Sequence, residues 1–166
     1  MADLVSDSGA LRFRLRLLDR EGRVPVPGGP GPGGRILAAA ALEYLDRRDG
    51  EHWPVVELGA LYLAAEAVQA LAAGLADAIR GAAPGLAWQS GEPAALGVQA
   101  GVPEGSPEGA WLVEVGMDLS GFLAGAAGTP VRPGAELALF RFPAARPALV
   151  AFASALEAEL RELVAP

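Results

Sequence analysis

The sequence predicts an α+β fold in which a single, mostly antiparallel sheet of about six strands carries two helices on one face, in the order β-β-α-β-β-β-β-α. Three observations support this prediction. Several segments alternate apolar and polar residues, which is typical of strands with one buried face. Two other segments place their apolar residues on one helical stripe. The connections between the later strands are short, which favours antiparallel pairing.

Two strands are predicted in the first part of the chain. Leu11–Leu17 alternates strictly, with leucines and a phenylalanine on one face and three arginines on the other. Residues 24–34 are rich in Pro and Gly and predict a flexible loop. Its Gly-x-Gly-x-x-Gly motif does not predict a nucleotide site, because Pro30 and Pro32 lack the N–H donors that cradle a phosphate. The alanines of Ile36–Asp46 are compatible with a helix, but a returning antiparallel strand is favoured.

The first helix is predicted over Leu58–Arg80, after a polar turn at 47–54. Its apolar residues recur at helical spacing, and Gly81 is a suitable residue to end it. Gly74 in its middle lowers helix stability, and close packing against the sheet is the one reason that we can suggest for it.

Four further strands and a second helix complete the prediction. The loops between them are expected at Gly101–Gly109 and 120–134. Pro143 is expected to end the last strand, and Pro147 to begin the last helix. No internal repeat is evident. The predicted strands are Leu86–Ser90, Ala95–Ala100, Ala110–Leu119 and Glu136–Phe142, and the helix carries an apolar stripe from Leu149 to Leu163.

The composition excludes several classes of function. The chain has no lysine, cysteine or asparagine, and His52 is its single histidine, so thiol, Schiff-base and multi-histidine metal chemistry are excluded. His52 lies in a polar run and is expected to be solvated. A GC-rich coding sequence would produce the same depletion, so its origin stays open. No cofactor is expected.

Charge and hydropathy suggest the compartment and the partner. The net charge of −7 disfavours nucleic acids and anionic membranes, and it suits a basic protein partner. The sequence shows no signal peptide and no apolar run long enough to span a membrane. We therefore expect a single cytoplasmic domain over residues 1–166.

Two surfaces are candidates for binding. The row Arg12, Arg14 and Arg16 would suit an anion or an acidic partner, unless the guanidiniums pair with Glu43 or Glu136 on neighbouring strands. The second candidate is a set of acidic loops that carry a tryptophan, a combination typical of protein interfaces; the alternative is that Trp53 packs under the sheet. The residues of this second set are Asp46, Asp49, Glu51, Trp53, Glu104 and Glu108.

A pair of carboxylates on one strand is a weaker candidate. Glu114 and Asp118 would lie on the same face about 13 Å apart, which exceeds the roughly 9.5 Å upper limit of a glycosidase pair. We expect these carboxylates to be structural or solvated.

The order of the predicted elements resembles that of the WapI-type immunity proteins, small bacterial proteins that bind and neutralise a toxin. The resemblance covers residues 35–164. It depends on a strand, polar turn and Trp over Ala38–Trp53, a helix over Leu61–Gly81, the strand Trp111–Val115 and a Leu- and Glu-rich helix over Leu149–Leu163. It implies a non-enzymatic cytoplasmic protein whose activity is tight binding, and it assigns no functional residue.

Three hypotheses about function follow. The first is a non-enzymatic protein-binding module, of the immunity type, that neutralises a basic toxin. The second is a subunit of a homo-oligomer or of a larger assembly. The third is a small enzyme that uses carboxylates and arginines, which predicts a pocket containing Glu114 or Asp118.

Overall fold

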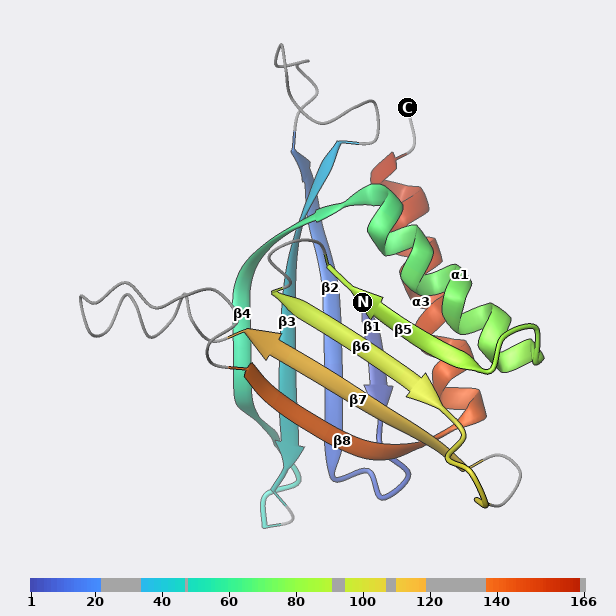
Figure 1. Cartoon of the computed structure of the whole chain (residues 1–166). Coiled ribbons are helices and arrows are strands. Elements are labelled where there is room, and N and C mark those ends of the chain that lie inside the picture. The colour runs from blue at the N-terminus through green and yellow to red at the C-terminus, as the bar shows by residue number, and fades with distance from the viewer. Residues whose placement is uncertain (22–33, 47, 91–94, 107–109, 119–136, 165–166) are drawn as a thin grey trace.

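The computed structural model confirms the α+β class and the antiparallel pairing but corrects the number of sheets (Figure 1). Within the described residues the strands form two sheets of four strands each, not one sheet of about six strands. A short first strand, Ala2–Val5, was not predicted. The predicted loop at 24–34, apart from Gly34, and the loop at 120–134 lie outside the described residues. The structure describes residues 1–21, 34–46, 48–90, 95–106, 110–118 and 137–164.

The first sheet has the order β1-β2-β3-β4, and every neighbouring pair is antiparallel. The strand predicted at 36–46 is confirmed as β3. The strands of this first sheet are β1 (Ala2–Val5), β2 (Leu11–Glu21), β3 (Arg35–Leu45) and β4 (His52–Ala64), and helix α1 (Ala65–Arg80) follows.

The second sheet has the order β5-β6-β7-β8 and is likewise antiparallel throughout. All four strands predicted for this part of the chain are confirmed within a few residues. The strands are β5 (Gly85–Gln89), β6 (Leu96–Gly101), β7 (Ala110–Asp118) and β8 (Leu137–Ala145), and helix α3 (Arg146–Val164) follows.

The predicted helix Leu58–Arg80 is wrong in its first part. Strand β4 begins at His52, inside the predicted turn, and continues to Ala64 before α1 starts. Ala64 is the N-cap, with extended backbone and no side-chain hydrogen bond. The Ser, Thr, Asp or Asn that normally marks a helix start is therefore missing from this junction. The Ala- and Leu-rich sequence at the end of β4 consequently resembles a continuation of the helix.

The ends of the later elements follow simple stereochemistry. Gly81 has φ 79°, and the N–H groups of Gly81 and Ala82 donate to Ala78 and Asp77, a Schellman motif that confirms the predicted helix end. Pro143 does not end its strand as predicted, because β8 continues to Ala145. Since β8 is an edge strand, the missing N–H of Pro143 need not interrupt a ladder.

Within the described residues, the two halves of the chain repeat the same ββββα order of elements. Their helices bury the same positions, each 81 residues apart. The equivalent pairs are Val68 and Leu149, Leu71 and Phe152, Ala72 and Ala153, and Leu75 and Leu156. The internal repeat thus exists in the pattern of burial, although identical residues are few.

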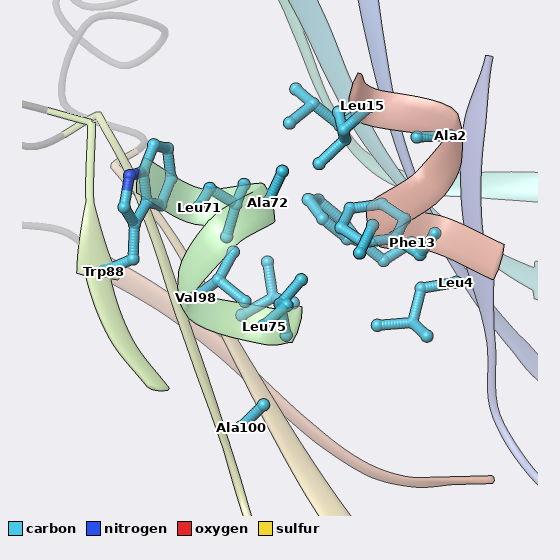
Figure 2. Packing of buried hydrophobic residues seen from close by; sticks show 14 of the residues in the cluster. Ala2, Leu4, Phe13, Leu15, Leu71, Ala72, Leu75, Trp88, Val98 and Ala100 are labelled. Carbon is cyan, nitrogen blue, oxygen red and sulfur yellow. The ribbon is translucent and has the colours of Figure 1, made fainter. Parts of the chain in front are cut away.

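Each helix packs on the sheet of the other unit. Helix α3 lies against β1 and β2, α1 lies against β5, and the two helices pack against each other (Figure 1). Phe13 of β2 contacts Phe152 of α3 with ring centroids 5.7 Å apart. Figure 2 shows Leu71 and Leu75 of α1 beside Val98 of the second sheet. Buried side chains from both sheets and both helices form one core cluster.

The prediction that Gly74 permits close packing can be tested by a double-mutant cycle. A Cβ on Gly74 would lie 2.6 Å from Cδ1 of Leu86 on β5, so this side chain would have to move. We expect Gly74→Ala to stabilise the Leu86→Ala variant by up to about 1 kcal/mol, the difference in helix propensity, and to give no such gain in the wild type. Urea unfolding of the four proteins measures the coupling. Equal gains in both backgrounds would contradict this packing.

Candidate functional site

The turn between β3 and β4 presents two aromatic side chains. Tyr44 and Trp53 are directly opposite in the β3–β4 register and are 44% and 48% exposed. Trp53 therefore does not pack under the sheet, whereas Trp111, on the inner face of β7, is buried. An exposed cross-strand pair of large aromatic residues is a natural anchor for a protein partner.

The acidic residues beside this aromatic pair also shape the turn. The carboxylate of Asp46 accepts the N–H of Arg48 at 2.9 Å, and that of Asp49 accepts the N–H of Glu51 at 2.8 Å. Both carboxylates thereby fix the turn. The side chain of Glu51 is exposed. We call Tyr44, Asp46, Asp49, Glu51 and Trp53 the hairpin surface.

The second acidic loop is separate from the hairpin surface. Glu104 is exposed in the segment after β6, and Figure 1 shows the β3–β4 turn and the β6–β7 connection at different corners of the molecule. Glu108 lies outside the described residues. The structure thus brings together Asp46, Asp49, Glu51 and Trp53 but leaves Glu104 apart from them.

The arginine row is largely occupied by neighbouring carboxylates. Glu43, only 7% exposed, receives Nε of Arg12 at 2.6 Å and Nη1 of Arg14 at 3.0 Å. Nε of Arg14 also lies 3.2 Å from Asp3 on β1. These four residues, which we call the Glu43 cluster, cross-link β1, β2 and β3. Arg16 is exposed and makes no ion pair within the described part of the chain, so an anion would find one unengaged guanidinium there and not three.

The carboxylates of Glu114 and Asp118 are each engaged by other groups of the chain. Glu114 receives Nε of Arg141 at 2.9 Å and a second bond from Nη2 across the β7–β8 ladder. Asp118 lies four residues further along β7 and has interactions of its own. The Glu114 carboxylate is thus engaged by a guanidinium of the neighbouring strand.

Glu114 nevertheless lines a depression on the outer face of the second sheet. The depression measures about 350 Å³, and its walls include Gln99, Gly101, Val102, Leu112 and Arg141. Gln99, Glu114 and Arg141 form one row across β6, β7 and β8 in the strand registers. Sequence reasoning missed Gln99 and Arg141, because nothing in the sequence says which strands are neighbours.

The described residues contain no group of three or more His, Cys, Asp or Glu side chains placed to hold a metal ion. None of the described helices has the length and apolar character that crossing a membrane requires.

The Glu43 cluster predicts a difference between two cross-strand carboxylates. Glu43→Ala removes charge-assisted bonds and leaves two half-buried guanidiniums side by side, so we expect it to cost about 1.5–3 kcal/mol of unfolding free energy. Glu114→Ala, the matched control, breaks a pair whose Arg141 side chain is 65% exposed and should cost less than about 1 kcal/mol. Urea unfolding compares them. Equal losses would show that the Glu43 cluster is ordinary surface pairing.

Comparisons with models of protein families, with curated proteins and with solved structures found no match. The hairpin surface and the depression on the second sheet are the two features that the geometry of the described residues offers for binding.

Proposed function

We propose that the protein is a non-enzymatic protein-binding module whose hairpin surface contacts the partner. The observation that carries the proposal is the exposed, in-register pair Tyr44 and Trp53 at the tip of β3 and β4. Tyr and Trp are the residues that most often dominate binding energy, because they bury a large area at a low cost in side-chain entropy. The strand ladder holds this pair in place before a partner arrives.

The charge around the pair supports a basic partner. Asp46, Asp49 and Glu51 lie in the same turn as Trp53 and outnumber its two arginines, Arg47 and Arg48, and the chain as a whole carries a net charge of −7. Such a surface would accelerate encounter with a basic protein and disfavour acidic competitors. Together with the resemblance described above, this supports an immunity-type protein that neutralises a basic toxin in the bacterial cytoplasm.

A second candidate is a subunit of a homo-oligomer. Val55 and Tyr62, also on β4, are 48% and 56% exposed, so two further large side chains are accessible on this edge strand. Light scattering over micromolar concentrations distinguishes the two proposals: a constant monomeric mass favours a different protein as partner, and a rising mass favours self-assembly.

Exchange of one aromatic residue tests the proposed surface. The binding partner to use is the purified product of each neighbouring gene, with affinity measured by calorimetry. We expect Trp53→Ala to weaken binding by about thirtyfold or more, as for a central anchor residue, because the pocket that receives the indole is left empty.

Tyr62→Ala is the matched control, since Tyr62 is an exposed aromatic residue at the opposite end of the same strand. We expect it to change the affinity less than about threefold. If no neighbouring gene product binds, the immunity role is wrong. If both variants weaken binding equally, the hairpin surface is not the contact site.

A further inference from the structure

The depression on the outer face of the second sheet is distinct from the hairpin surface. Its polar side consists of the row Gln99, Glu114 and Arg141, and its apolar side includes Leu112 and the loop residue Val102. Polar groups beside an apolar wall, in a concave surface, are the usual features of a small binding site.

Gly101 lines the depression, and the fold itself does not require glycine at this position. Gly85 must be glycine, because a Cβ there would lie 2.8 Å from the carbonyl oxygen of Ala100. A Cβ on Gly101 would meet nothing closer than 3.9 Å, and its φ is not positive. Gly101 therefore contributes space and not packing. Glycine in a strand weakens it, and it often marks a place where a ligand approaches closely.

The polar row retains unused hydrogen-bonding capacity. Arg141 donates from both Nε and Nη2 to one oxygen of Glu114, Oε2. Oε1 of Glu114 and the Nη1 group of Arg141 thus have no hydrogen-bond partner among the residues that the structure describes. Within the described residues the Gln99 side chain has no hydrogen-bond partner, so its amide offers both a donor and an acceptor. The row therefore presents donors and acceptors side by side.

The charges of this row compensate each other. Because the Arg141 guanidinium is paired with the Glu114 carboxylate, the site offers little net attraction to an anion or to a cation. Adjacent donors and acceptors instead match the N–H and C=O groups of a peptide unit. The apolar wall beside them fits an aliphatic side chain.

From this arrangement we propose that the depression binds a short extended peptide segment of a partner protein, with a neutral aliphatic side chain seated over Gly101 and its peptide groups on the Gln99–Glu114–Arg141 row. This site does not depend on the proposed role of the hairpin surface. The shallow, open shape implies weak binding of a single residue and stronger binding only when a longer segment lies across the sheet.

Titration with the N-acetyl amides of leucine, lysine and glutamate, followed by amide chemical shifts in NMR, tests the proposal. We expect the leucine compound to give saturable shifts at residues 99–101, 112 and 141, with a dissociation constant on the order of millimolar, as is usual for so few atoms. The lysine and glutamate compounds should bind at least about threefold more weakly.

Two valine variants locate the site. Gly101→Val fills the depression and should weaken the leucine compound by at least about tenfold. Gly97→Val is the matched control. Gly97 lies on the same outer face of β6 but does not line the depression. A Cβ on Gly97 would meet only a backbone oxygen, at 3.6 Å. It should leave binding unchanged, as should Trp53→Ala.

Three outcomes would overturn the proposal. The first is the absence of saturable shifts with all three compounds. The second is tighter binding of a charged compound, which would assign the site to a different class of ligand. The third is equal binding by the wild type and by Gly101→Val. Failure of the hairpin variants to affect a partner, by contrast, would leave this site unaffected.

Discussion

The exchange of helices between the two ββββα units is the constraint on which the rest of the structure depends. A four-stranded antiparallel sheet with one apolar face cannot remain stable alone in water and must be covered. Here α3 covers β1 and β2 of the first sheet, and α1 covers β5 of the second. Phe13 and Phe152 meet in one of these contacts, and Nε1 of Trp88 donates to the carbonyl of Ala67 in the other. Neither unit therefore has a closed core of its own.

This arrangement determines which surfaces remain for binding. The inner faces of the sheets and the apolar stripes of the helices are used in the shared core. On the outer face of the first sheet, the charged side chains of the Glu43 cluster pair with one another and connect β1, β2 and β3. On the outer face of the second sheet, small residues and one exposed ion pair leave a depression. The β3–β4 tip carries exposed aromatic residues. We therefore expect binding at the depression and at the β3–β4 tip, where the side chains are least involved in holding the fold together.

The elements with a strict pattern were the predictable part of the fold. Leu11–Leu17 and Ala110–Leu119 alternate so regularly that a strand was the one consistent interpretation, and both are confirmed. The start of α1 was missed because Ala64 provides no capping side chain and the strand before it is rich in Ala and Leu. The split into two sheets was missed because alternation identifies strands but not their neighbours.

The candidate site was predictable to a similar degree. Trp53 and the acids of its turn were identified from composition, and the structure places them together. The arginine row was correctly located on one face, but its engagement by Glu43 depends on the β2–β3 register. Gln99 and Arg141 are 42 residues apart in the sequence and meet on one face only because β7 lies between their strands. Such sites depend on which strands pair and in which register, and this pairing is determined by the packing of the core.

The central claim is that the two units share one core and fold together. Equilibrium urea unfolding tests it most directly, followed in a Trp53→Phe background so that fluorescence reports Trp88 and Trp111 of the second sheet. Amide NMR signals of β2 and β3 report the first sheet in the same samples. The exchange of helices predicts coincident transitions with one midpoint. Two separated midpoints, one for each sheet, would contradict a shared core.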